Sequence, residues 1–282
     1  MNTTQDTKTT LVLGGTGKTG RRVAERLVRR GLPIRIGSRA GKLPFDWDDQ
    51  ATWGPALHNV GAVYITYYPD LAVPAAVEAV RTFAALAVES GARRLVLLSG
   101  RGEEAAGQAE QAVMDCGAEW TILRASWFAQ NFSESFFLDA VLAGHIALPA
   151  GAIREPFIDV EDIADVAVAA LTDDRHIGQL YELTGPRLMT FAEVVDAIGT
   201  ASGRSLNYED IPPEQYAVLL KHHNVPTDFI ELVMYLFTTV LDGRNAHLAD
   251  GVQRALGRQP RDFTDYANAA AASGIWNVGQ VA

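Results

Sequence analysis

The chain reads Leu11-Val12-Leu13-Gly14-Gly15-Thr16-Gly17-Lys18-Thr19-Gly20 near its N-terminus. The apolar run is typical of a short strand, and glycines follow it at positions 14, 17 and 20. From residue 21 to 28 the apolar positions recur with the 3.6-residue period of a helix. A strand, a glycine turn and a helix in this order seat a pyrophosphate on the helix N-terminus, so the sequence predicts a dinucleotide site.

The type of phosphate site follows from spacing and charge. Gly17-Lys18-Thr19 could belong to a nucleoside-triphosphate loop, but that motif requires glycine at position 12, where Val12 stands. After the next predicted strand, residues 33–37, an NAD-specific site usually offers a carboxylate, whereas this chain offers Ser38 and Arg39. Because a guanidinium binds a 2′-phosphate well, the sequence favours NADP(H). The alternative is that Arg39 is a solvated turn residue.

The composition excludes several classes of protein. The chain has 282 residues, 48% of them hydrophobic, and can bury a large core. Its formal net charge of −10 argues against binding nucleic acid or an anionic membrane surface. Apolar runs are too short to span a bilayer and residues 1–6 lack signal-peptide character, so we expect a cytoplasmic protein. Cys116 is the only cysteine, and the histidines lack the spacing of metal ligands, so we expect no metal site.

Strand-like runs alternate with helical patterns through the first half of the chain. The strands are predicted at 11–13, 33–37, 62–67, 94–98 and 120–123, and the helices at about 18–30, 72–90 and 104–116. This alternation is typical of an α/β protein with a Rossmann-type doubly wound parallel sheet. Thr66-Tyr67-Tyr68, Ser99 and Trp127 follow the carboxyl ends of strands, where such sheets bind their ligands.

The pattern changes after about residue 130. A loop is predicted at 144–156, and residues 157–160, the helix from 161 to 171 and a strand at 180–184 predict a return to the main sheet. Residues beyond about 190 are mostly helical in pattern. We therefore expect three parts: a dinucleotide-binding domain at 1–132, a return segment at 157–185, and a smaller, mainly helical substrate-covering lobe formed by 133–156 and 186–282.

The usual proton donor of short-chain dehydrogenases is missing. That donor is a tyrosine whose pKa is lowered by a lysine four residues later. None of the eight tyrosines here has lysine at that position. Hydride addition to an iminium needs no proton, and a quinone or an enone demands little acid catalysis, so the sequence favours direct hydride transfer to such an acceptor. A ketoreductase with another donor, such as Tyr67, Tyr68 or Tyr235, stays open.

Several motifs together resemble one family. They are Gly14–Gly20, Phe45-Asp46-Trp47, Thr52-Trp53, Leu123–Phe132, Asp159–Ala164 and Gly257–Arg261. By these motifs the chain resembles, over about residues 9–276, the NmrA-like family of atypical short-chain dehydrogenases/reductases. Within it, the chain is most similar to the branch of ergot-alkaloid agroclavine dehydrogenases and festuclavine synthases. The wider family includes NADPH:quinone reductases and also redox sensors that bind NADP without turnover.

The resemblance implies a Rossmann fold with a C-terminal lobe, and it assigns roles to residues. The pyrophosphate would be held by Gly14, Thr16, Gly17, Lys18, Thr19 and Gly20, and the 2′-phosphate by Arg39 beside Ser38. Thr66, Tyr67 and Ser99 would border the cofactor, and Trp127, Phe128 and Asn131 the nicotinamide end. One departure is that quinone reductases of the family often carry histidine and lysine in the segment aligned with 106–111, where this chain has Ala106 and Gln111.

Structural alternatives stand beside these roles. We take Ser99 and Tyr67 as candidate catalytic residues, although serine at a strand end can serve a turn and tyrosine can serve packing. The candidate substrate-binding residues are Tyr68, Trp127, Phe128, Asn131 and Phe132. An aromatic stripe at helical spacing is more often core than pocket, and Asn131 can anchor backbone.

Two functions remain at this point. The first is an NADPH-dependent reductase of a small hydrophobic conjugated molecule in specialised metabolism, and the second is a non-catalytic NADP(H) sensor that acts on a protein partner. The missing tyrosine and lysine fit both functions. The aromatic residues favour the reductase, because a sensor has no need to shield a hydride path from water. The oligomeric state stays open.

Overall fold

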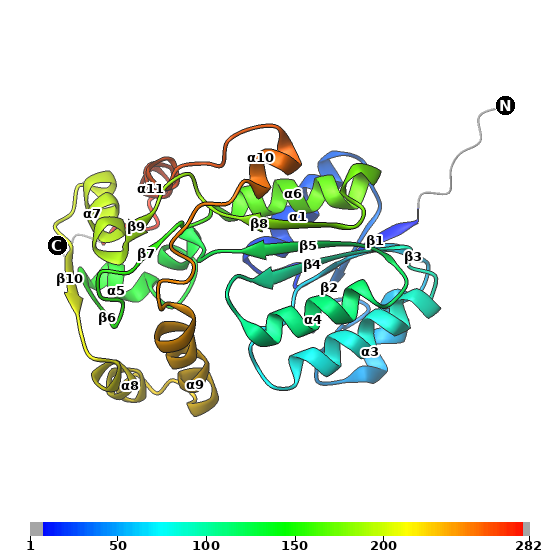
Figure 1. Cartoon of the computed structure of the whole chain (residues 1–282), viewed down its shortest axis with the longest axis horizontal. Coiled ribbons are helices and arrows are strands. Elements are labelled where there is room, and N and C mark those ends of the chain that lie inside the picture. Colours follow the sequence, from blue (N-terminus) through cyan, green and yellow to red (C-terminus); the bar gives the residue numbers. More distant parts are fainter. Residues whose placement is uncertain (1–7, 279–282) are drawn as a thin grey trace. The chain divides into compact units, whose positions relative to one another are not determined.

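The computed structural model describes residues 8–278, which divide into two compact units (Figure 1). The first unit comprises the chain through Ala125, together with Glu161–Leu183 and Asp250–Arg258. The second comprises Ser126–Val160, Thr184–Ala249 and the residues from Gln259 onward. The chain therefore passes between the units several times, and each unit is built from separate segments of sequence.

A six-stranded parallel sheet forms the centre of the first unit, in the order β2-β1-β3-β4-β5-β8. Its strands are β1 (Thr9–Leu13), β2 (Ile34–Gly37), β3 (Val60–Ile65), β4 (Arg94–Gly100), β5 (Glu119–Ala125) and β8 (Gln179–Leu183). β2 and β3 lie on opposite sides of β1, so the winding direction reverses there, which is the switch point where such sheets bind ligands. The predicted Rossmann-type doubly wound sheet is confirmed.

Helices cover both faces of this sheet. Figure 1 shows α1 (Lys18–Arg29) and α6 (Val160–Thr172) on one face, with α3 (Ala76–Glu89) and α4 (Glu104–Met114) on the other. Short elements η1 (Gln50–Thr52), α2 (Trp53–Leu57), η3 (Asp174–His176) and α10 (Gly251–Leu256) complete the unit. Because both faces are covered, the middle of β1 is a continuous apolar run, and Leu11, Val12 and Leu13 are fully buried.

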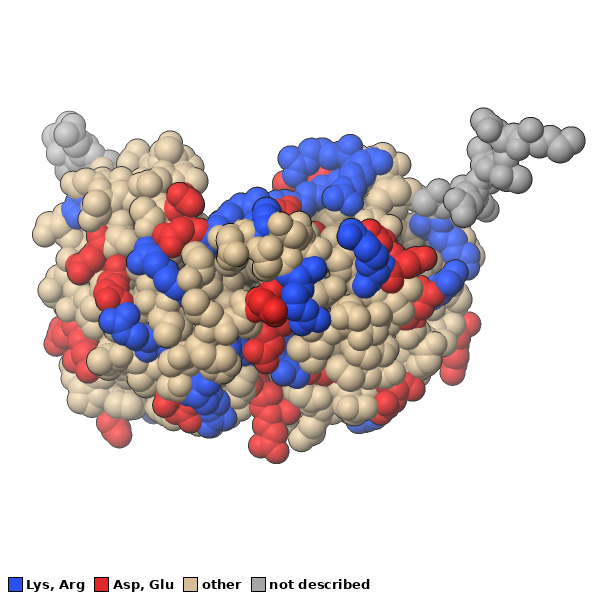
Figure 2. All heavy atoms as spheres, turned by 45° about the horizontal axis from the view of Figure 1, so that its top comes forward, with Lys and Arg blue, Asp and Glu red and all other residues tan. Residues whose placement is uncertain are grey.

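Ion pairs join α1, α6 and the segment after α10. Arg26 Nε lies 2.7 Å from Asp165 Oδ1, and Arg258 Nη2 lies 2.7 Å from both Asp162 Oδ1 and Asp165 Oδ2. Asp162 is fully buried, and Arg258 pairs with its carboxylate. Over much of the face drawn in Figure 2, basic and acidic side chains lie next to one another. Asp162 and Arg258 belong to two of the motifs that carry the resemblance, Asp159–Ala164 and Gly257–Arg261. The ion pair between them therefore gives both motifs a structural role.

The second unit combines two small sheets with helices. β6 (His145–Leu148) pairs with β10 (Asn207–Asp210), and β7 (Arg154–Glu155) pairs with β9 (Met189–Thr190). The helices are η2 (Ala129–Phe132), α5 (Leu138–Ala143), α7 (Phe191–Ser202), α8 (Pro213–His222), α9 (Thr227–Tyr235), the π-helical η4 (Leu236–Val240) and α11 (Phe263–Ala272). Thr190 and Glu193 form a capping box that starts α7.

Several predicted boundaries differ from the structure. The segment predicted as a loop at 144–156 contains β6 and β7, and residues 157–160 form no strand of the main sheet. Instead, Ile158 makes an isolated bridge with Phe128, so residues 126–132 and 157–160 both belong to the second unit. Residues 250–258, predicted in the substrate-covering lobe, belong to the first unit because Gly251 packs directly on β8. A Cβ there would lie 2.1 Å from the carbonyl oxygen of Glu182.

Two further observations concern the described residues as a set. Between residues 8 and 278, no helix combines the length and the apolar character needed to cross a bilayer. In the same part of the chain, no group of three or more His, Cys, Asp or Glu side chains is arranged to hold a metal ion.

Candidate functional site

The glycine turn between β1 and α1 brings backbone atoms unusually close together. Gly14 has a φ of +60°, and its carbonyl oxygen accepts a 2.8 Å hydrogen bond from the Gly17 amide. A Cβ on Gly20 would lie 2.3 Å from that same oxygen, so α1 packs against the turn only because residue 20 is glycine. The turn therefore has the tight geometry that the glycine spacing predicts.

The start of α1 suits an anion. Gly17 precedes the helix in an extended conformation and has no side chain with which to cap it. The first turn carries Lys18 and no acidic residue, so the partial positive charge of the helix N-terminus is not offset by a carboxylate on the same turn. Thr16, Lys18 and Thr19 lie at this end of α1, as predicted for a pyrophosphate site, and Thr19 is buried.

Thr66 lies across the switch point from the glycine turn. Its hydroxyl donates a 3.1 Å hydrogen bond to the carbonyl oxygen of Leu13, the last residue of β1. A Cβ on Gly14 would lie 2.4 Å from the same hydroxyl oxygen. The loop after β3 is thus in direct contact with the turn, and the two together form one surface at the carboxyl edge of the sheet.

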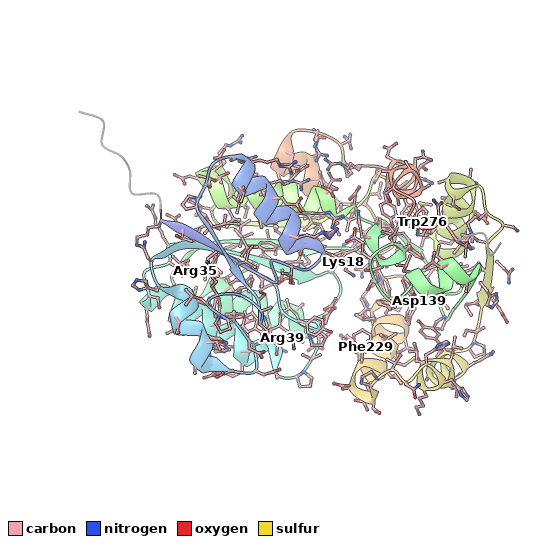
Figure 3. The ribbon with its side chains drawn as sticks, turned by 180° about the vertical axis from the view of Figure 1, so that it is seen from behind. Lys18, Arg35, Arg39, Asp139, Phe229 and Trp276 are labelled. Atoms are coloured by element: carbon pink, nitrogen blue, oxygen red, sulfur yellow. The ribbon has the colours of Figure 1, made fainter. Side chains whose placement is uncertain are left out.

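Arg39 lies just past the end of β2 with its side chain exposed, as Figure 3 shows together with Lys18 at the first turn of α1. β2 ends at Gly37, which is paired with Leu13 beside the glycine turn. The loop is held in shape because the carbonyl oxygen of Ser38 accepts hydrogen bonds from the amides of Gly41 (3.1 Å) and Phe45 (3.0 Å). An exposed guanidinium on an ordered loop beside the turn is suited to a 2′-phosphate.

Ser99, at the end of β4, belongs to a buried polar network. Its hydroxyl donates a 2.6 Å hydrogen bond to Oε1 of Glu110 on α4, and both side chains are buried. Arg124 on β5 donates from Nε to the same oxygen at 2.9 Å and from Nη1 to Glu182 at 3.2 Å. The Ser99 proton is therefore committed to a carboxylate, and the hydroxyl is left to act as an acceptor.

Sequence reasoning identified Ser99 but missed Glu110, Arg124 and Glu182. The only available signal was a charged residue on the apolar period of a predicted helix, at position 110. That signal does not reveal the partner, because Arg124 comes from another element.

A second carboxyl lies nearby on the loop before α4. Burial raises the pKa of Glu103 to about 9, with further contributions from Asp70 and Glu110. Asp70 also lies within hydrogen-bonding reach of Glu103. Glu103 therefore holds its proton more tightly than an exposed carboxyl does, a property that no sequence pattern indicated.

The tyrosines after β3 lack the environment of an activated donor. Tyr67 is half-buried, and burial and the nearby Asp48 raise the pKa of its hydroxyl. An activated tyrosine needs the opposite change, which a cation produces. Tyr68 is 72% exposed. The catalytic role predicted for Tyr67 thus has no electrostatic support.

In the second unit, the predicted substrate residues have different environments. Trp127 is half-buried and packs on Phe191 and Phe237, with ring centroids 5.5 and 5.0 Å apart. Phe132 is fully buried in the aromatic core, and its carbonyl oxygen accepts a 2.9 Å hydrogen bond from Trp276 Nε1. Phe132 is therefore a core residue, and the prediction that it binds substrate is wrong because its side chain is fully buried.

Phe128 and Asn131 are half-buried, and their backbones are tied locally. Phe128 bridges to Ile158, and the Asn131 amide donates a 3.1 Å hydrogen bond to the carbonyl oxygen of Phe128. Nearby, Phe136 is 39% exposed and packs on Phe137 (4.3 Å) and on Phe229 of α9 (6.3 Å). Phe229, labelled in Figure 3, was missed because it lies far from the aromatic segment in sequence.

Comparison with known proteins identifies relatives along nearly the whole chain. An uncharacterized oxidoreductase of Bacillus subtilis (strain 168) is 32% identical over 274 residues, covering 93% of this chain and 95% of the relative. Agroclavine dehydrogenase of Claviceps fusiformis is 32% identical over 281 residues, covering 92% and 96%. The structure of an NADPH-dependent quinone oxidoreductase from Escherichia coli, complexed with NADPH, matches with a TM-score of 0.77 at 18% identity, covering 93% and 99%.

The family is shown by the match to its model, and the relatives extend the similarity along the chain. The model of the NmrA-like family matches residues 107–266, which is more than half of the chain. The relatives that are 32% identical extend the match over both units. The chain therefore belongs to the NmrA-like family.

Proposed function

We propose that this protein is an NADPH-dependent reductase that transfers hydride directly to a small, hydrophobic, conjugated acceptor, first of all a cyclic iminium ion. A quinone or an enone is the next candidate. The observation that carries the proposal is that a tight dinucleotide turn lies on the same sheet edge as a serine whose proton is already committed to Glu110. A site with this arrangement suits an acceptor that takes hydride without needing a proton.

The residues that would hold the dinucleotide fit its phosphates. The uncapped N-terminus of α1, with Lys18, would bind the pyrophosphate, and the exposed Arg39 would bind the 2′-phosphate. When bound, NADPH supplies the hydride from its nicotinamide ring. The fit rests on the close approach of Gly20 to Gly14, which any side chain at position 20 would prevent.

The polar network at the end of β4 would orient ligands. Ser99, buried and held by Glu110, can accept a hydrogen bond from an amide of the cofactor or from a substrate. The iminium carbon becomes an amine carbon when hydride arrives, and its nitrogen becomes neutral without a proton transfer. The names of the relatives are consistent with redox chemistry on organic molecules, since they include a dehydrogenase and a quinone oxidoreductase.

Three aromatic side chains of the second unit would contact the apolar substrate: Trp127 and Phe229, which are half-buried, and Phe136, which is 39% exposed. Trp127 and Phe136 both pack on Phe137, so they present one aromatic surface. Such rings offer a large apolar area to a conjugated ligand. We expect them to affect the substrate more than the cofactor.

The experiment is a spectrophotometric assay of NADPH oxidation against cyclic iminium ions, quinones and enones, with a simple ketone as the negative control and NADH in parallel. Turnover of the iminium but not of the ketone supports the proposal. Phe136→Ala should raise the substrate KM without changing the Kd for NADPH, while Leu248→Ala, at another exposed apolar position, should change neither. Tight NADPH binding without oxidation of any acceptor would instead favour a redox sensor.

A further inference from the structure

The two tryptophan motifs, Phe45-Asp46-Trp47 and Thr52-Trp53, fold into one unit. The Asp46 amide donates a 3.0 Å hydrogen bond to the Thr52 hydroxyl, and the Asp46 carbonyl oxygen accepts a 2.7 Å hydrogen bond from Trp53 Nε1. The Thr52 hydroxyl in turn donates to the carbonyl oxygen of Asp49 at 2.6 Å. Both polar groups of the Asp46 backbone are thus bonded within the segment, and the carbonyl oxygen has a second donor in the Thr52 hydroxyl at 3.3 Å.

An aromatic core anchors this segment to α3. Trp53 is 1% exposed and Phe45 is 4% exposed. Both rings pack on Phe83 of α3, with centroids 5.7 and 5.5 Å away. Trp47 packs on Phe83 as well, at 5.3 Å, but it is only partly buried. The segment is therefore a rigid base from which Trp47 reaches toward the sheet edge.

Trp47 contacts the loop after β3 in two ways. Its indole Nε1 donates a 3.0 Å hydrogen bond to the carbonyl oxygen of Thr66. Its ring also packs on Tyr67, with centroids 4.9 Å apart and planes inclined by 46°. Residues 66–70 form neither helix nor strand, so these contacts hold the loop at its first two residues.

We propose that Trp47 is a positioning residue for the dinucleotide site, because it holds Thr66 in the place where the Thr66 hydroxyl supports the glycine turn. The chain of contacts runs from Trp47 Nε1 to the Thr66 carbonyl oxygen, and from the Thr66 hydroxyl to the Leu13 carbonyl oxygen. The turn has little tolerance for movement, since a Cβ on Gly14 would already collide with the Thr66 hydroxyl. The inference rests on the dinucleotide part of the proposed function.

The test compares Trp47→Phe with Trp53→Phe in the full chain. Each change keeps an aromatic ring and removes one indole N–H that bonds to a backbone oxygen, but the partner is Thr66 for Trp47 and Asp46 for Trp53. By isothermal titration calorimetry, Trp47→Phe should raise the Kd for NADPH about three- to tenfold, the value of one hydrogen bond. Trp53→Phe should change the Kd less than about twofold, because its bond does not reach the turn. Equal effects of the two changes, or an unchanged Kd in Trp47→Phe, would overturn the proposal.

A second readout does not depend on NADPH. Hydrogen exchange in the free protein should be faster in peptides that cover residues 13–17 and 66–70 of Trp47→Phe, and unchanged there in Trp53→Phe. Thr66→Val, which removes the hydroxyl bond to Leu13, should accelerate exchange in residues 13–17 to a similar extent, and the double variant Trp47→Phe/Thr66→Val should add little. If wild-type protein binds no NADPH, the proposed function fails, and the exchange still decides whether Trp47 holds the turn.

Discussion

The Ser99 hydroxyl lies 2.6 Å from Oε1 of Glu110, and Arg124 donates to the same carboxylate oxygen at 2.9 Å. Glu110 is 2% exposed, so its charge is stabilised by these two donors rather than by water. In this arrangement the serine is an acceptor toward any ligand. The end of β4 therefore differs from a site in which a serine and an activated tyrosine both donate to a carbonyl oxygen.

Ser99→Ala should reduce kcat for a quinone acceptor less than about tenfold, because the Ser99 proton is bonded to Glu110 and the variant loses only a hydrogen-bond acceptor. Steady-state kinetics with saturating NADPH measures the effect. Removal of a general acid lowers kcat about a hundredfold or more. A loss of that size would contradict the conclusion that Ser99 donates its proton to Glu110 and does not protonate the substrate.

Gly20→Ala should raise the Kd for NADPH at least about tenfold, because the new Cβ would lie 2.3 Å from the Gly14 carbonyl oxygen and force α1 away from the turn. Gly107→Ala is the matched control, since residue 107 lies within α4 and a Cβ there meets no atom within 4 Å. Fluorescence titration with NADPH measures both variants. Equal affinities for the two would show that the turn does not bind the cofactor.

Arg39→Glu should remove the preference for NADPH over NADH, raising the Kd for NADPH at least about tenfold and changing the Kd for NADH less than about threefold. The reason is that Arg39 would pair with the 2′-phosphate that NADH lacks. Arg29→Glu makes the same charge change at an exposed position at the other end of α1 and should leave both constants unchanged. If Arg39→Glu also leaves NADPH binding unchanged, Arg39 is a solvated turn residue.

The sequence was sufficient for the sheet and the glycine turn, because both depend on local patterns. Continuous apolar strands and the spacing of Gly14, Gly17 and Gly20 carry that information directly. Residues 157–160 were misassigned because an apolar run has the same pattern in either unit, and only the bridge to Phe128 distinguishes them. Glu110 and Arg124 were missed for a related reason, since an ion pair between α4 and β5 leaves no trace at fixed sequence spacing.

Glu103→Gln should change how stability depends on pH. The pKa of Glu103 rises from an ordinary value of 4.5 to about 9 in the folded protein. Protonated Glu103 therefore contributes to the free energy of unfolding. This contribution is fully present below pH 4.5 and is lost as the pH rises toward 9. Glutamine stays neutral at every pH. The Tm of the variant minus the Tm of the wild type should therefore be about 3 °C or more larger at pH 8.5 than at pH 5.5. Thermal unfolding curves that run parallel for the two proteins would show that Glu103 is ionised like an exposed carboxylate.

Direct hydride transfer is tested most closely by NADPH that carries deuterium at both hydrogen positions of C4 of the nicotinamide ring, incubated with the protein and a cyclic iminium ion in ordinary water. Mass spectrometry and NMR of the amine product locate the label. We expect one deuterium on the former iminium carbon. An amine without deuterium, or NADPH that binds and is never oxidised, would contradict the proposed reductase.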